Sequence, residues 1–140
     1  MSPQPFPHLK PAEGLLWAAF LRDHGTEYAY FDYDVKVGRG HPTLPTQPDY
    51  IKRMIATLSP KRIDVVGWRG MQPTIFEVTP RGGRTLIGAC LLYRWLFAET
   101  FPSSLLPWSA AVVASVDPDV ERFLVREGVT LYRFPTVLPG

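Results

Sequence analysis

The chain has 140 residues, enough for one hydrophobic core and too few for two domains of ordinary size. Its net charge of +2 is too small to indicate nucleic-acid binding through electrostatics alone. A lone cysteine, Cys90, excludes an internal disulfide and favours a reducing compartment.

Residues 1–10 contain three prolines at alternate positions, Pro3, Pro5 and Pro7. Because proline favours the polyproline conformation and lacks a backbone donor, this segment is predicted to be an extended arm. It has no apolar stretch of the kind found in secretion signals, and no apolar run approaches the roughly 20 residues of a membrane-spanning helix. We therefore expect a cytoplasmic or virion protein that neither carries a signal peptide nor spans a membrane.

Residues 11–134 are predicted to form a single domain, followed by a short tail over residues 135–140. A helix over residues 11–23 begins with proline and stops at Gly25. Residues 27–37 alternate as a strand, and residues 49–58 follow as a short amphipathic helix. The apolar side of that first strand is predicted to face the core as one set: Ala29, Phe31, Tyr33, Val35 and Val37.

Two apolar runs at residues 63–68 and 74–79 flank glycines 67 and 70, which predicts a pair of strands joined by a turn. Each strand carries one carboxylate in an apolar setting, Asp64 in the first and Glu77 in the second. Burying a carboxylate is costly unless it is paired or binds a metal. The two strands are thus the first place to look for a functional site.

A largely apolar helix is predicted over residues 85–98, and a short buried strand over residues 110–115. Asp117 caps a further helix that ends near Gly128, and a last strand follows over residues 129–134. A strand, a helix and a strand in succession indicate a parallel crossover. The fold class predicted from this order is α/β, with a mixed β-sheet flanked by helices.

The central stretch resembles the core of the PD-(D/E)XK nucleases, which have the restriction-endonuclease-like fold. In that family an Asp on one strand and a Glu-x-Lys on the next bind a divalent metal, and a helix follows. Asp64 matches the family Asp and Glu77 matches the Glu, but Thr79 stands in place of the Lys. In the branch whose helix carries Gln-x-x-x-Tyr, Tyr93 matches the Tyr and Ala89 stands in place of the Gln.

The resemblance assigns Asp64, Glu77 and Thr79 to the catalytic positions, and Asp64, Glu77 and the Val78 carbonyl to Mg²⁺ or Mn²⁺ if the site is active. Thr79 can donate a hydrogen bond but carries no charge, so it cannot stabilise the negative charge that develops in phosphodiester cleavage. Family members often add a glutamate from the first helix, for which Glu13 is the candidate; its alternative role is to favour the helix dipole. The alternative for Asp64 and Glu77 is a purely structural, hydrogen-bonded pair that binds no cofactor.

Basic residues offer two further possibilities. Lys36, Arg81 and Arg84 are candidates for a relocated basic residue near the site. A basic cluster could also contact nucleic acid, although a solvated surface explains the same residues. The predicted nucleic-acid contacts are Lys52, Arg53, Lys61, Arg62, Arg69, Arg81 and Arg84.

Two functions follow from different classes. The first is a non-catalytic protein of the nuclease fold that serves as a structural or assembly subunit, for which the head–tail neck of a phage virion is the concrete version. Its partners would be other protein subunits bound through the arm of residues 1–10. The second is an active Mg²⁺- or Mn²⁺-dependent DNA nuclease, and DNA binding without cleavage is a third possibility.

Overall fold

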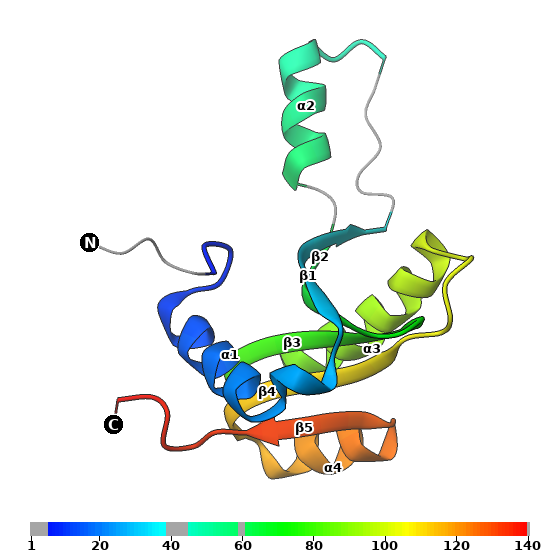
Figure 1. Ribbon diagram of the computed structural model, residues 1–140. Helices are drawn as coiled ribbons and strands as arrows, with labels where there is room; N and C mark the ends of the chain where they lie inside the picture. Colours follow the sequence, from blue (N-terminus) through cyan, green and yellow to red (C-terminus); the bar gives the residue numbers. More distant parts are fainter. Residues whose placement is uncertain (1–5, 39–44, 59–60, 140) are drawn as a thin grey trace.

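The computed structural model describes residues 6–38, 45–58 and 61–139, so the first five residues of the predicted arm and the last residue of the predicted tail lie outside it. The helices are α1 (Pro11–His24), η1, a 3-10 helix (Gly25–Glu27), α2 (Asp49–Leu58), α3 (Arg84–Thr100) and α4 (Pro118–Arg126). The strands are β1 (Tyr30–Val37), β2 (Lys61–Arg69), β3 (Gln72–Gly82), β4 (Trp108–Val116) and β5 (Val129–Arg133) (Figure 1).

The strands form one sheet in the order β1-β2-β3-β4-β5. Strand β2 is antiparallel to both β1 and β3, whereas β4 is parallel to β3 and to β5. The tight turn between β2 and β3 consists of Gly70 and Met71, and Gly70 has φ of 58°. The predicted mixed sheet and the predicted parallel crossover through α4 are therefore confirmed.

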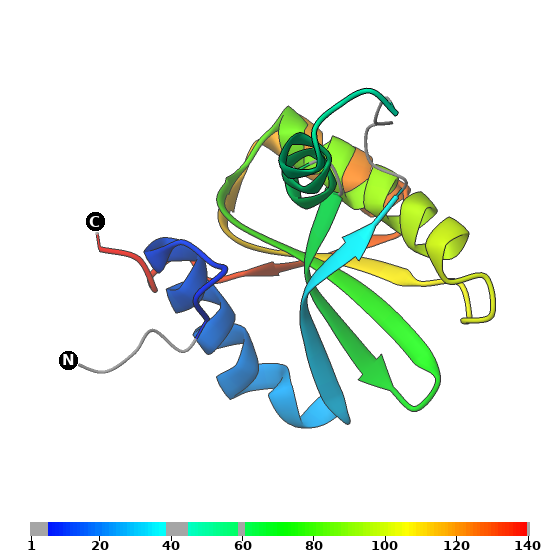
Figure 2. The same ribbon diagram turned by 90° about the horizontal axis from the view of Figure 1, so that it is seen from above.

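Helices cover both faces of the sheet, with α1 on one face and α3 on the other (Figure 2). On the α1 face, Trp17 and Phe20 pack against Phe76 at the centre of the sheet, with ring centroids 5.3 and 4.9 Å from that of Phe76. On the opposite face, α3 packs Leu86 and Leu96 against separate halves of the sheet, and α4 joins the first of them. This three-layer arrangement buries the central strands on both sides.

The alternation predicted for β1 is wrong at its second half, because the strand changes face at Asp34. Phe31 packs with the α1 cluster, whereas Val35 and Val37 pack with the α3 cluster. Asp34 has φ of 56°, a left-handed conformation that breaks the regular two-residue repeat. Its carboxylate accepts a hydrogen bond from Arg62 of β2 at 2.7 Å.

Strand β3 continues past Pro80, where the sequence predicted its end. Thr79 and Arg81 pair with Val113 and Ser115 of β4, so the parallel ladder runs on across the proline. The pairing of β3 with β2 stops at Phe76, so Pro80 lies in a segment that pairs with β4 alone. A proline is tolerated there because no β2 partner requires its missing N–H.

The described part of the arm, residues 6–10, packs on its own domain. Leu9 is buried, and the ring of Phe6 lies 5.7 Å from that of Tyr33. Leu138 of the tail packs against the same hydrophobic cluster. These contacts order the arm and the tail within the chain, and docking of the arm on another subunit stays a prediction.

Helix α2 stands away from the three layers, above the sheet in Figure 1. None of the helices in the described ranges is long and apolar enough to cross a membrane.

Gly67, inside β2, provides the first test of this packing. A Cβ at this position would lie 2.9 Å from both Phe31 Cε1 and Tyr28 Cδ1, which is closer than real side chains approach. We expect Gly67→Ala to lower the free energy of unfolding by about 1–3 kcal/mol in urea denaturation, because the aromatic cluster must shift. Gly88→Ala is the matched control, since nothing lies within 4 Å of its Cβ position, and it should stabilise α3 by about 0.5–1 kcal/mol. Equal effects of the two substitutions would contradict this packing.

Candidate functional site

The carboxylates of Asp64 and Glu77 come together where β2 and β3 begin to separate. Val66 pairs with Ile75 and Val65 with Phe76, so the same register continued places Asp64 opposite Glu77. Residues directly opposite in an antiparallel pair share a face of the sheet. The two carboxylates therefore lie on the face of the sheet that α3 covers.

Side chains replace the backbone ladder at this point. The Val78 N–H donates to the Asp64 carboxylate, with 2.9 Å between Val78 N and Asp64 Oδ2. On the same residue, the Asp64 backbone oxygen lies 3.1 Å from His8 Nε2 of the arm. The polar groups of Asp64 are thus held by β3 on one side and by the arm on the other, which fixes the carboxylate against Val78.

Of the two carboxylates, that of Glu77 has the more unusual environment. The residue is 8% exposed, and its Oε1 atom has no hydrogen-bond partner within the part of the chain that the structure describes. Burial raises the pKa of Glu77 well above its ordinary value, and the nearby charge of Asp64 raises it further. An unpartnered carboxylate oxygen in this setting is a strong candidate ligand for a cation.

The pKa of Asp64 is also raised, again chiefly by burial, while the hydrogen bond from the Val78 backbone opposes the rise. A nearby carboxylate disfavours ionisation of the other, so burial and mutual repulsion together favour proton binding by the pair when no cation is present.

A small cavity of about 240 Å³ opens beside Glu77. It lies between the end of β3 and the first turns of α3, so atoms from both elements face it. Thr79 and Ala89 both line this cavity; they stand where the nuclease family that the sequence resembles has lysine and glutamine. Arg81 lines the cavity as well, so it is the predicted basic residue that shares this cavity with Glu77 among the described residues.

Tyr93 and Glu13 lie within electrostatic reach of the pair. Burial raises the pKa of the half-buried Tyr93, and the charges of Glu77 and Asp64 raise it further. The charge of Glu13 contributes to the raised pKa of both carboxylates. Glu13 Oε1 nonetheless accepts a hydrogen bond from the Lys10 backbone at 3.0 Å, so its observed contact is that of a helix cap.

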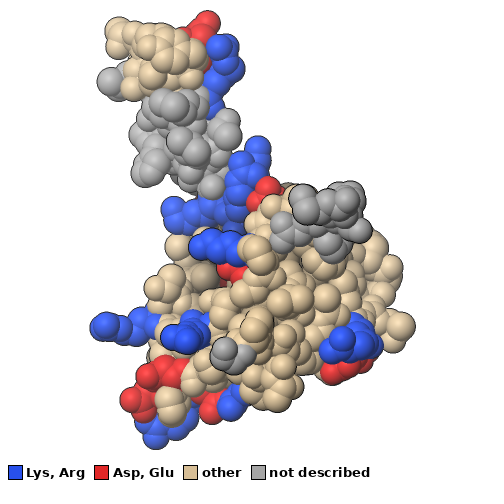
Figure 3. All heavy atoms as spheres, turned by 90° about the vertical axis from the view of Figure 1, so that its left-hand side faces the viewer, with Lys and Arg blue, Asp and Glu red and all other residues tan. Residues whose placement is uncertain are grey.

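The remaining basic residues are spread over the molecule. Lys52 and Arg53 lie on the projecting α2, where Lys52 Nζ donates to the Pro45 carbonyl. Lys61 and Arg69 occupy opposite ends of β2, and Arg69 pairs with Glu27 at 3.1 Å. On the face drawn in Figure 3, basic side chains stand in separate groups, several of them beside acidic ones.

Of the other basic candidates, Arg62 pairs with Asp34 near the start of β2, and Arg84 begins α3. Arg84 lies beside a second hollow, formed with α4, from which Glu77 is absent. Lys36 lies on β1, paired in register with Arg62. The predicted basic cluster is thus not one patch in the fold.

His8 is a site residue that sequence reasoning missed. A histidine within a proline-rich arm has no partner at metal-ligand spacing, so its sequence position carries no signal. Its role depends on the arm folding back over β2, a long-range contact across 56 residues.

The residue types at this site are those that bind a divalent cation. Carboxylate oxygens are the ligands that Mg²⁺ prefers, and Glu77 supplies an oxygen that no other described group satisfies. Among residues 6–38, 45–58 and 61–139, no group of three or more His, Cys, Asp or Glu side chains converges as a metal site. A cation here would be held by Asp64 and Glu77, with the Val78 carbonyl as the third ligand that the family resemblance implies.

No protein-family model matches the chain, and no curated protein matches it in sequence. Among solved structures, the crystal structure of a repair endonuclease from Pyrococcus abyssi matches with a TM-score of 0.53 and 12% identity, over 90% of this chain and 48% of that chain. The crystal structure of a protein of unknown function matches with a TM-score of 0.46 and 17% identity, over 85% of this chain and 55% of that chain.

The chain therefore spans about half the length of these two solved structures. The match to the repair endonuclease, together with the mixed sheet and its flanking helices, shows that the chain has a nuclease-like fold. At 12% identity the likeness concerns the fold alone.

The raised pKa of Glu77 predicts how stability depends on pH. Folding raises this pKa above the ordinary value of 4.5, so the folded state binds the proton more tightly than the unfolded state does. The contribution of Glu77 to stability is present below pH 4.5 and is lost as the pH rises towards the folded pKa. Without divalent cations, Glu77→Gln should therefore stabilise the protein at neutral pH by about 1–3 kcal/mol, measured by urea denaturation.

The exposed Asp23→Asn serves as the control and should leave the pH profile unchanged. A Glu77→Gln variant that is less stable than the unsubstituted protein at neutral pH would show that the Glu77 carboxylate is well satisfied in the folded chain.

Proposed function

We propose that the chain is a non-catalytic protein of the nuclease-like fold that retains a divalent-cation site at Asp64 and Glu77. The observation that carries this proposal is the buried, unpartnered Oε1 of Glu77 beside a second carboxylate. A carboxylate pair that served only the fold would be expected to satisfy its buried oxygens with hydrogen bonds. A cation offsets both negative charges and uses the oxygen that the chain leaves unsatisfied.

Each residue of the site has a defined part in holding the cation. The Val78 N–H fixes one oxygen of Asp64, and His8 holds the backbone of the same residue, so Asp64 is preorganised. Glu77 presents its free oxygen from the adjoining strand. A bound Mg²⁺ or Mn²⁺ would supply Lewis acidity and charge neutralisation to a phosphate group.

We propose that the chain is not catalytic because Thr79 is neutral where the family has a positively charged lysine. The hydroxyl of Thr79 lines the same cavity as Glu77 and can donate one hydrogen bond. It cannot offset the negative charge that develops on the transferring phosphate. Loss of one preorganised stabilising group typically costs on the order of 10²–10³ in rate, and the loss of a charged group costs more.

A second candidate function, an active Mg²⁺- or Mn²⁺-dependent deoxyribonuclease, is favoured by one observation. Arg81 lines the cavity beside Glu77, two residues after Thr79 and on the same side of β3. Its guanidinium is always charged and could take over the electrostatic role of the family lysine. One solved structure with a similar fold is that of a repair endonuclease, which also supports this candidate.

The finer role that we propose for a non-catalytic chain is that of an assembly subunit, with the neck of a phage virion as one concrete setting. A small protein that catalyses no reaction acts through binding. Large apolar side chains are exposed on the surface of this protein. Met71 is 78% exposed and Leu106 is 76% exposed. Exposed apolar groups of this size are typical of protein interfaces. Other protein subunits are the proposed partners, and DNA is the alternative.

Cation binding can be measured without any assay of cleavage. We expect Mn²⁺ to raise the melting temperature of the unsubstituted protein at neutral pH, because a ligand that binds only the folded state stabilises it. Glu77→Gln and Asp64→Asn should each abolish this rise, since each removes one charged ligand. Asp23→Asn, which leaves the pair intact, should retain it. A rise of equal size in Glu77→Gln would place the cation elsewhere.

Cleavage distinguishes the two candidate functions. The unsubstituted protein is expected to leave single- and double-stranded DNA intact in Mg²⁺ or Mn²⁺, whereas Thr79→Lys should gain metal-dependent cleavage that Asp64→Ala then removes. The double variant Thr79→Lys, Asp64→Ala is thus the control for contamination. Cleavage by the unsubstituted protein that is lost in Arg81→Ala would reject the non-catalytic proposal and establish the nuclease.

A further inference from the structure

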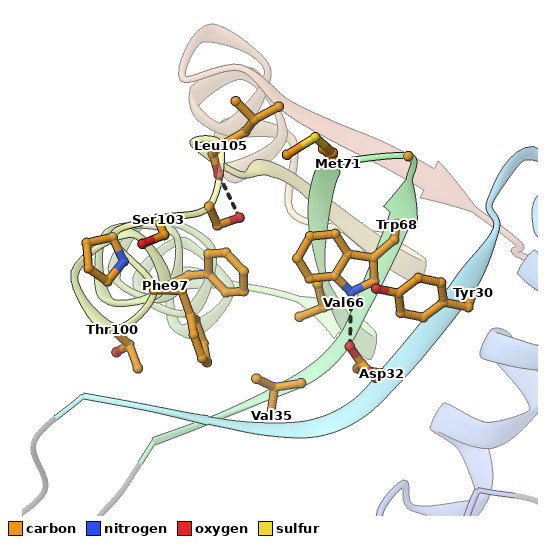
Figure 4. Close-up of a pocket in the computed structure, with 14 residues that line it drawn as sticks. Tyr30, Asp32, Val35, Val66, Trp68, Met71, Phe97, Thr100, Ser103 and Leu105 are labelled. Atoms are coloured by element: carbon orange, nitrogen blue, oxygen red, sulfur yellow. Dashed lines mark hydrogen bonds between the residues drawn. The ribbon is translucent and has the colours of Figure 1, made fainter.

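A further hollow of the described chain lies away from the carboxylate pair, at the other end of β2 and α3. It measures about 660 Å³ and opens between the tip of the β2–β3 hairpin and the loop after α3. Figure 4 shows Trp68 on one side of it, Phe97 on the other, and Met71 and Leu105 near its rim. A volume of this size accommodates one or two large side chains or a small ligand.

A stacked aromatic pair and a carboxylate form one wall. The rings of Tyr30 and Trp68 stack with centroids 5.9 Å apart and an angle of 17° between their planes. Trp68 Nε1 donates to Asp32 Oδ2 at 3.0 Å, which fixes the indole and holds the carboxylate at its edge (Figure 4). The indole N–H is a neutral donor, so this hydrogen bond leaves the negative charge of Asp32 uncompensated.

The rim of the hollow is apolar and exposed. Tyr30, Met71 and Leu105 line the hollow and are all exposed to solvent. Gln72 Nε2 donates to the Leu106 carbonyl at 2.9 Å, which ties the hairpin tip to the loop after α3 and brings the exposed Leu106 to the same edge. Tyrosine, tryptophan and methionine are enriched at protein interfaces, and this rim displays all three.

Charge distinguishes the kinds of partner that could bind here. Among the described residues that line the hollow, none is a lysine or arginine, and Asp32 is the only charged one. Nucleic acid is bound mainly through cations that neutralise its phosphates, so a nucleic-acid strand is disfavoured. A partner with apolar bulk and a positive charge complements both the aromatic wall and the carboxylate.

We propose that this hollow is a docking site for a segment of a partner protein in which a large apolar side chain stands next to a lysine or arginine. The apolar side chain fills the space between Trp68, Met71 and Leu105. The basic side chain lies over the Tyr30–Trp68 pair as a cation–π contact and reaches the Asp32 carboxylate. This inference rests on the proposed assembly role and assigns it to one surface.

The test begins with selection of short random peptides on the immobilised full-length chain. Enriched peptides are then synthesised, each with a matched version in which the basic residue is replaced by glutamate, and binding is measured by calorimetry. We expect enrichment of aromatic or long aliphatic residues beside Lys or Arg, and binding about tenfold weaker for the glutamate versions.

Three variants locate the site. Met71→Glu places a charge on the rim and should weaken binding by at least about tenfold. Asp32→Asn keeps an oxygen that accepts from Trp68 Nε1, so the pocket retains its shape while its preference for the basic peptide over the glutamate version disappears. Val125→Glu, at an exposed valine on α4, is the control and should bind as the unsubstituted protein does.

If the peptides bind Met71→Glu as tightly as they bind the unsubstituted protein, the docking site does not lie at this hollow. The proposed assembly role is unaffected by that result. If no peptide is enriched, both the surface and the assembly role fail. A preference for the glutamate versions, or tighter binding of oligothymidine at the same site, would overturn the proposed chemistry. Self-association that Met71→Glu abolishes would identify a second copy as the occupant and overturn the proposal of a different partner.

Discussion

The hydrogen bond from the Val78 backbone to the Asp64 carboxylate is the contact on which the site depends. Pairing between β2 and β3 is recorded only as far as Val65 and Phe76, and β2 continues instead with β1. A side chain thus completes the link that the backbone leaves open, and the separation of the strands makes room for Glu77 and its cavity. The arm reinforces the arrangement, because His8 contacts the backbone carbonyl oxygen of Asp64.

This arrangement costs stability in the absence of a cation. Two buried carboxylates repel one another, and an unsatisfied buried oxygen loses its hydrogen bonds to water. Such costs are commonly retained where a group has a function or an inherited role. The nuclease-like fold accounts for the position of the pair, and the neutral Thr79 accounts for our proposal that its chemistry has been lost. The apolar hollow at the far end of β2 gives a binding function that does not depend on that chemistry.

Much of the fold could be predicted from the sequence, because each regular element carries a local signal. Alternation and the intervening turn placed Asp64 and Glu77 on adjacent strands, and Asp117 was recognised as the cap of α4, where its carboxylate accepts from Asp119 and Val120. The change of face at Asp34 carries no such signal, since it depends on a left-handed backbone and the contact with Arg62. His8 and the continuation of β3 past Pro80 were missed for a similar reason, because both depend on which strand or arm lies alongside.

The central claim is that Asp64 and Glu77 together hold a divalent cation. Crystals of the protein grown with Mn²⁺ at neutral pH, with data collected at the manganese absorption edge, test it directly. The account predicts an anomalous peak bonded to a carboxylate oxygen of each residue, with Glu77 Oε1 as one ligand. A structure without such a peak, in which Glu77 Oε1 forms a hydrogen bond with the protein or with water, would contradict the claim and leave the pair a structural one.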